Sequence, residues 1–150
     1  MSKTTAKNFA VFCNACEYWL DYLGLKDYEV HYRHQECDCR AMCFADPAAG
    51  IAILVLSKEW HDCHVTDENV EKSAFHEVSE LLLAKLVQHA VNRSTTREDI
   101  EISTHEIIRR MENTFYRDAI HSKDTPGKVV RGVPKTRSKS KARAVKTKSG

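Results

Sequence analysis

The fold of this chain is decided by residues 51–83, which read IAILVLSKEWHDCHVTDENVEKSAFHEVSELLL. Residues 51–56 are all apolar, and a short run of this kind is typical of a buried strand. Thr66 then supplies a helix N-cap, and two acids follow it in the first helical turn, where the helix dipole favours them. We therefore expect a buried strand followed by a helix that runs to about Ala90. Its predicted core stripe consists of Phe75, Val78, Leu82 and Leu86.

The periodicity continues on both sides of this stretch. Upstream, the pattern predicts a helix over about residues 7–23, a strand over 28–34, a weaker strand over 40–45 and a turn over 46–50. Downstream, overlapping capping boxes at Thr95 and Thr96 begin a last helix. We expect its core face to carry Ile100, Ile107, Met111 and Phe115. The order of one helix, three strands and two helices predicts an α+β domain with an antiparallel or mixed sheet.

The net charge of +2 over 150 residues conceals two regions of opposite sign. Residues 123–150 contain ten Lys or Arg and a single acid, which gives +9 and leaves −7 for residues 1–122. The basic region has too little apolar surface to offset the entropy of ordering it. We therefore predict a folded domain over 1–122 and a flexible basic tail over 123–150.

Several classes of protein are excluded by composition. No stretch approaches the 18 apolar residues of a membrane span, and residues 1–9 lack the apolar run of a secretory signal. We therefore expect no membrane association and a location in the cytoplasm. In a reducing compartment the six cysteines are thiols or metal ligands rather than a disulfide framework.

The helix that follows the buried strand carries the motif His76-Glu77-x-x-Glu80. Positions i and i+4 lie on one face of a helix, so His76 and Glu80 can reach the same metal ion. Glu77 lies beside that face, where its carboxylate can polarise a metal-bound water. Zinc accepts carboxylate oxygen as well as imidazole nitrogen, and the arrangement is that of the His-Glu-x-x-His metallopeptidases with one ligand exchanged. Exposed His and Glu residues are also common on charged helices that bind no metal.

A catalytic zinc usually takes three protein ligands and one water. His105 is the first choice for the third ligand, because Ile102 and Ile108 flank it on the next helix and it can face inward. Glu106 is the second choice.

These motifs resemble a family of small phage-encoded metallopeptidases in the style of the SprT-like zincins. The resemblance covers about residues 8–120 and is carried by FHEVSELLL over 75–83 and HEIIRRMEN over 105–113. Four upstream segments resemble the family's opening helix and three strands: residues 19–25, 28–30, 40–41 and 51–56.

The resemblance implies a zincin-like fold with a Zn²⁺ ion between the last two helices. It implies that His76, Glu80 and His105 are ligands, and that Glu77 is the general base for hydrolysis of a peptide or protein in the cytoplasm of the phage host. Glu80 departs from the usual zincin motif, which has His at that position. An extra carboxylate lowers the charge at the metal and makes its bound water less acidic, so a non-catalytic protein on a degenerate zincin-like scaffold is the alternative.

Two further features are open to more than one interpretation. Cys37, Cys39, Cys43 and Cys63, with His61 and His64, contain suitable zinc ligands, but their spacing matches no standard knuckle, and we favour idle or buried thiols. The basic tail can neutralise phosphates, so it can bind nucleic acid without sequence specificity; it can also dock on the acidic domain or act only as a solvated extension.

Overall fold

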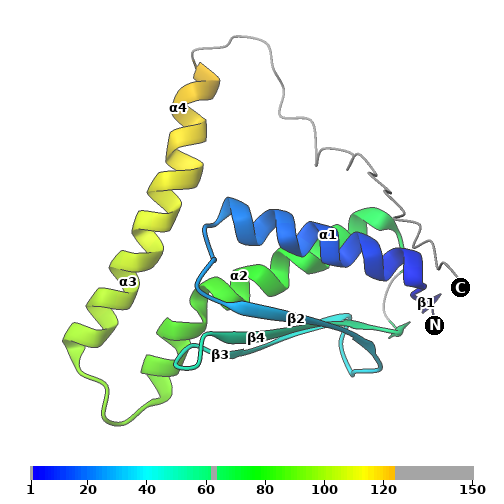
Figure 1. Ribbon diagram of the computed structural model, residues 1–150, viewed down its shortest axis with the longest axis horizontal. Coiled ribbons are helices and arrows are strands. Elements are labelled where there is room, and N and C mark those ends of the chain that lie inside the picture. Colours follow the sequence, from blue (N-terminus) through cyan, green and yellow to red (C-terminus); the bar gives the residue numbers. More distant parts are fainter. Residues whose placement is uncertain (1, 62–63, 124–150) are drawn as a thin grey trace, which may run out of the picture.

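The computed structural model describes residues 2–61 and 64–123, and it has an α+β architecture (Figure 1). A short N-terminal strand precedes the first helix, three longer strands follow, and the chain ends in helices. The elements in chain order are β1 (Ser2–Lys3), α1 (Ala6–Tyr22), β2 (Glu29–Gln35), β3 (Ala41–Asp46), β4 (Ile51–Ser57), β5 (Glu59–Trp60), α2 (Asp67–Val91), α3 (Arg97–Met111), the π-helical turn η1 (Glu112–Tyr116) and α4 (Arg117–Lys123).

The main sheet is mixed and has the strand order β2-β4-β3. β4 is the central strand, parallel to β2 and antiparallel to β3, which explains why its sequence is apolar without interruption. Ala52, Leu54 and Leu56 are buried on one of its faces and Val55 on the other. β1 and β5 form a separate two-residue ladder, which is too short to leave a periodic signal in the sequence.

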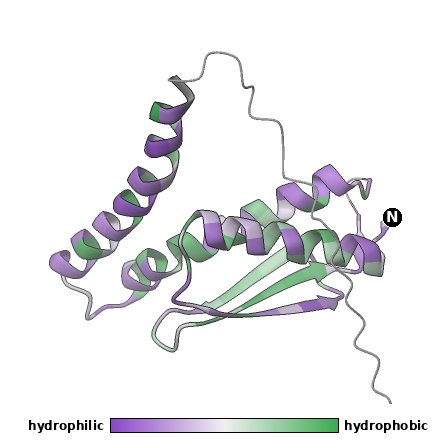
Figure 2. Ribbon diagram, turned by 45° about the horizontal axis from the view of Figure 1, so that its top comes forward, coloured by the Kyte–Doolittle hydropathy of each residue, from purple (hydrophilic) through white to green (hydrophobic). Residues whose placement is uncertain are grey.

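Helices α1 and α2 cover one face of this sheet, while α3 to α4 form an arm that extends away from it (Figure 1). The two covering helices begin at threonine caps, Thr5 and Thr66, whose side chains accept from backbone N–H groups of the first turn. The central strand β4 is apolar, whereas the edge strand β2 and the arm are mainly polar (Figure 2). Within the described part of the chain, no helix has the length and apolar content needed to cross a membrane.

The predicted core stripe of α2 is partly wrong. Val78 is buried, but Phe75 is 39% exposed, and the buried apolar residues are Val70, Ala74, Val78 and Leu81. The helix has apolar residues on several sides, so its sequence does not define which side meets the sheet. Phe75 instead packs edge-on against Trp19 of α1, with 4.7 Å between the ring centroids.

The predicted core face of the last helix is also largely wrong. Ile100, Met111 and Phe115 are each about two-fifths exposed or more, and the buried residues of the arm are Ser103 and Thr114. The arm projects from the domain, so little of its apolar face finds a partner. Polar contacts tie it down instead: Arg110 donates to the carbonyl of Gly24 and pairs with Asp27, and Tyr22 donates to Asp118 over 2.7 Å.

Candidate active site

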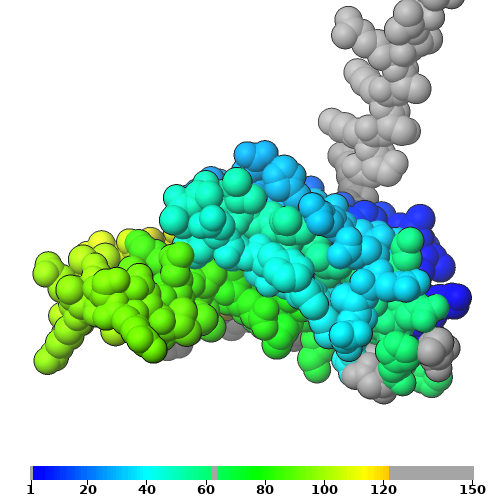
Figure 3. All heavy atoms as spheres, turned by 90° about the horizontal axis from the view of Figure 1, so that it is seen from below, coloured from blue at the N-terminus to red at the C-terminus, as the bar shows by residue number. Residues whose placement is uncertain are grey.

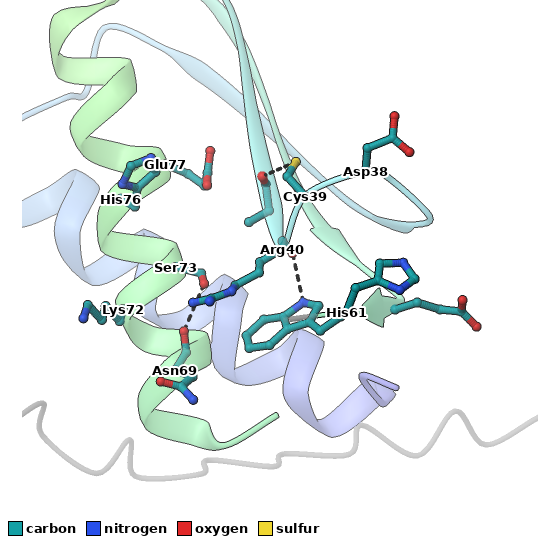
Figure 4. A pocket seen from close by; sticks show the side chains of 12 residues that line it. Asp38, Cys39, Arg40, His61, Asn69, Lys72, Ser73, His76 and Glu77 are labelled. Atoms are coloured by element: carbon teal, nitrogen blue, oxygen red, sulfur yellow. Dashed lines mark hydrogen bonds between the residues drawn. The ribbon is translucent and has the colours of Figure 1, made fainter. Parts of the chain in front are cut away.

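A cavity of about 520 Å³ lies between the first half of α2 and the chain entering β3 (Figure 4). Two of the residues predicted from the sequence, His76 and Glu77, line it from α2. The full lining is Asp38, Cys39, Arg40, Ala41, Glu59, Trp60, His61, Asn69, Lys72, Ser73, His76 and Glu77. Trp60 is buried, and its indole N–H donates to the carbonyl of Arg40 over 3.1 Å, which joins β5 to the chain entering β3.

Glu77 is the buried acid of this cavity. Its residue surface is only 4% exposed, and its side chain extends from α2 toward the loop that carries Cys39 (Figure 4). Among the described residues, nothing hydrogen bonds to its carboxylate or forms an ion pair with it. Burial, and to a smaller extent the negative charge of Glu80, raise the pKa of Glu77 from 4.5 to about 7. The carboxyl therefore titrates near neutral pH, as suits a group that both accepts and returns a proton.

His76 and Glu80 lie together on the exposed side of the same helix. The Nε2 atom of His76 is 3.2 Å from Oε1 of Glu80, as the i,i+4 spacing predicts. Their side chains are 70% and 52% exposed, so both donors are accessible from solvent. The arrangement brings one imidazole and one carboxylate to a single point beside Glu77.

The donor set fits zinc in kind but is short of one ligand. Imidazole and carboxylate both bind zinc, yet a catalytic site normally has three protein ligands. Over residues 2–61 and 64–123, no three His, Cys, Asp or Glu side chains are grouped to hold a metal ion. His76 and Glu80 therefore provide two contact points, and no catalytic step is derived below from a bound metal.

His105 is not brought to this site. It is exposed on α3 and lines a separate hollow of about 370 Å³ with Glu98, Glu101, Ile102, Glu106 and Arg109. Ile102 and Ile108, the neighbours that led us to expect an inward position, are themselves 49% and 43% exposed. Glu106 is held in an ion pair with Lys85 at 2.9 Å.

Two thiols near Glu77 were not assigned to the site from the sequence. Burial, followed by the neighbouring Cys37 and then the charge of Glu77, raises the pKa of Cys39 to about 11. Burial, followed by the charge of Glu77, raises the pKa of Cys43 to about 12, so both are neutral thiols at physiological pH. The position of Cys43 follows from strand alternation, since residues 41, 43 and 45 share the face of β3 toward the helices. No comparable pattern indicates the position of Cys39, which lies in the loop before β3.

The remaining cysteines do not form a metal site in the described part of the chain. The sulfurs of Cys37 and Cys39 are 3.9 Å apart, and Cys16 is buried in the core beside the partly buried Cys13. Cys63, the fourth cysteine of the candidate zinc-ligand set that includes His61 and His64, lies outside the described residues. The same holds for the basic tail beyond Lys123.

No protein-family model, curated protein or solved structure matches this chain. The resemblance to the small phage metallopeptidases therefore gains no support from these comparisons and stays a prediction.

Proposed function

We propose that this chain is a metal-dependent peptidase on a zincin-like scaffold, acting in the cytoplasm of a phage-infected cell, with Glu77 as its proton-transfer residue. One observation carries the proposal: Glu77 is a buried, unpaired carboxyl with a pKa of about 7, and it opens into a cavity beside the accessible pair His76 and Glu80. Shifted pKa values of this kind are concentrated at functional sites.

The chemistry assigned to Glu77 is general base and then general acid catalysis. Above pH 7 its carboxylate accepts a proton from the water that attacks the peptide carbonyl, and it then gives that proton to the departing amine. Zinc held by His76 and Glu80 would supply Lewis acidity to the same water and carbonyl. Among the described residues, no side chain is hydrogen bonded to Glu77. Its carboxyl is therefore free to accept and return this proton.

An extended peptide is the substrate that the neighbouring sheet favours. β3 is an edge strand, because within the described residues it pairs only with β4. A free strand edge can receive a peptide as an additional strand through main-chain hydrogen bonds. α2 packs against β3, so a peptide added there would pass the cavity that contains Glu77.

The test separates metal binding from hydrolysis. Zinc is measured in full-length protein purified without chelator, and cleavage of unfolded casein at pH 8 is followed by mass spectrometry. We expect His76→Ala to lose zinc and cleavage together, and Glu77→Gln to keep zinc while losing cleavage at least a hundredfold. Cleavage by Glu77→Gln at the rate of the unchanged chain would remove Glu77 from the mechanism.

A non-catalytic binding protein is the second candidate, and the missing third ligand favours it. In this alternative the helix with His76 and Glu80 is structural, and the chain binds a host protein or, through residues 123–150, nucleic acid. Duplex DNA binding by the full chain at low and high salt tests the nucleic-acid form, with a variant in which the Lys and Arg residues of 128–148 are replaced by Gln. Equal binding by both proteins would exclude the tail as the contact.

A further inference from the structure

A second hollow lies in the same seam between α2 and β3, beyond Glu77. It has a volume of about 570 Å³. Its walls are formed by the second half of α2 and by β3 with the turn that follows it: Cys43, Ala45, Pro47, Glu80, Leu83, Ala84, Val87 and Gln88. Side chains of β3 and α2 lie next to each other across this face of the molecule (Figure 3).

The two hollows follow one another along a single seam. The first is lined by residues 38–41 and 69–77, and the second by residues 43–47 and 80–88, so β3 and α2 run in the same direction. Five strand steps from Ala41 to Asp46 cover roughly 17 Å, and ten helical steps from Ser73 to Leu83 cover roughly 15 Å. Glu77 and Glu80 therefore lie near the middle of the seam, with one hollow on each side.

The two hollows differ in chemistry. The first is lined by charged and polar groups such as Asp38, Lys72 and His76. The walls of the second are mainly apolar, with Leu83 and Val87 both exposed on α2, and Glu80 and Gln88 are their polar members. The thiol of Cys43 is neutral at physiological pH because burial raises its pKa, so it adds no charge to these walls. A ligand that fills both hollows therefore needs an apolar side chain at the second hollow and polar groups at the first.

We propose that this second hollow is the specificity pocket of the cleft, and that it receives an aliphatic side chain of an extended peptide bound along the free edge of β3. The proposal rests on the proposed function, because it takes Glu77 as the point of cleavage. The unpaired edge of β3 supplies the reason for an extended peptide. An aliphatic residue is favoured because Leu83, Val87 and Ala45 form walls of this hollow. Glu80, which lines the same hollow at its end nearest Glu77, disfavours an acidic residue near the point of cleavage.

Binding is measured separately from cleavage, with the full-length Glu77→Gln protein and fluorescein-labelled decapeptides in an anisotropy titration. The first peptide alternates Thr and Leu, the second replaces each Leu by Asp, and the third has the first sequence with alternate backbone nitrogens methylated. We expect at least tenfold weaker binding of the second peptide, since it loses the apolar burial. We expect a similar loss for the third, because methylation removes the N–H groups that pair with β3.

The protein itself offers a matched pair of substitutions. Val87→Asp places a charge in the second hollow, and Val91→Asp places the same charge one turn later on α2, where the residue is 77% exposed and outside the hollow. Both side chains are exposed, so both variants are expected to keep the circular dichroism spectrum of the parent. We expect Val87→Asp to lower the affinity for the Thr-Leu peptide about tenfold. Val91→Asp should leave this affinity unchanged.

The outcomes distinguish this inference from the proposed function. The specificity pocket would be overturned, even if casein is cleaved, by either of two results. One is equal affinity of the parent and Val87→Asp for the Thr-Leu peptide. The other is equal affinity of the parent for the Thr-Leu peptide and its methylated form. Selective binding of the Thr-Leu peptide that Val87→Asp abolishes would support the pocket even if no cleavage is found, and the absence of cleavage would then count against the peptidase alone.

Discussion

The ammonium of Lys85 lies 2.9 Å from both carboxylate oxygens of Glu106, and this ion pair joins α2 to the arm. It lies on the turn of α3 that also carries His105. His105, the residue before Glu106, is exposed and lines a separate hollow together with Glu98, Glu106 and Arg109. The position of the arm thus determines which side chains of α3 can reach the cavity that contains Glu77.

Zinc content tests this placement directly. We expect His76→Ala to lose bound zinc and His105→Ala to retain it, because His105 is exposed in another hollow. Elemental analysis of the two full-length variants, purified side by side without chelator, makes the comparison. Loss of zinc in His105→Ala to the same extent would show that His105 completes the site and that the arm closes on α2 when metal is bound.

The ion pair between Lys85 and Glu106 is expected to contribute modestly to folding. Both side chains are a little over two-fifths exposed, so solvent screens the pair, and its coupling energy should be about 0.5 kcal/mol. A double-mutant cycle with Lys85→Met and Glu106→Gln, followed by urea unfolding, measures it. The pair Arg97 and Glu101, within α3 alone, is the control for a contact that joins no second element. A coupling energy that does not fall in high salt would contradict an electrostatic origin.

The buried carboxyl of Glu77 makes folding pH-dependent. Its pKa rises from 4.5 in the unfolded chain to about 7 in the folded one, so the stability present below pH 4.5 is lost as the pH rises toward 7. The full shift corresponds to at most about 3 kcal/mol, and after allowing for solvent screening we expect roughly 1–2 kcal/mol. Urea unfolding at pH 5 and pH 8 should show this loss in the parent and a smaller one in Glu77→Gln. Glu68→Gln, an exposed acid in the first turn of α2, is the control, and equal pH slopes in the parent and Glu77→Gln would contradict the assignment.

Hydrolysis should depend on pH with the opposite sign. A general base works as the carboxylate, so kcat/KM for casein cleavage is expected to rise through about pH 7 as Glu77 ionises. The residual cleavage by Glu77→Gln should lack this rise, because the titrating carboxyl is gone. A rise with the same midpoint in Glu77→Gln would show that another group controls the profile.

Two glycines with positive φ give a matched test of backbone strain. Gly50, at φ 66°, is the last residue of the turn before β4, and a Cβ there would lie 2.9 Å from the carbonyl oxygen of Asp27. Gly24, at φ 64°, has a Cβ position whose nearest neighbour is a flexible arginine side chain at 3.7 Å. We expect Gly24→Ala to cost about 1 kcal/mol and Gly50→Ala clearly more, since it adds a backbone clash. Equal changes in the free energy of unfolding would mean that the turn relaxes.

Local sequence patterns predicted the elements of this fold well. β4 and the helices α1 and α2 lie within a residue or two of the predicted ranges, because apolar periodicity and threonine caps act over a few neighbouring residues. The mixed sheet was one of two predicted forms. The parallel pairing of β2 with β4 depends on a crossover that no local pattern records.

The site was predicted only where it depends on a single helix. His76 and Glu80 meet as their spacing predicts, because four residues on α2 determine their separation. The position of His105 depends instead on how α3 leaves α2, and its apolar neighbours gave the wrong indication because both are exposed. The π-helical turn at Glu112–Tyr116 changes the helical register of the arm, and residue periodicity did not reveal it.

The location of the motif within α2 has a consequence for ligand binding. His76, Glu77 and Glu80 occupy the middle of a 25-residue helix, more than two turns from either end. Fraying is confined to the first and last turns, so it does not reach these residues. Their backbone is already ordered in the free protein, and a metal ion or peptide that binds there does not have to supply the entropy of forming the helix. The motif is thus preorganised, and the loss of freedom on binding is confined to its side chains and to the ligand.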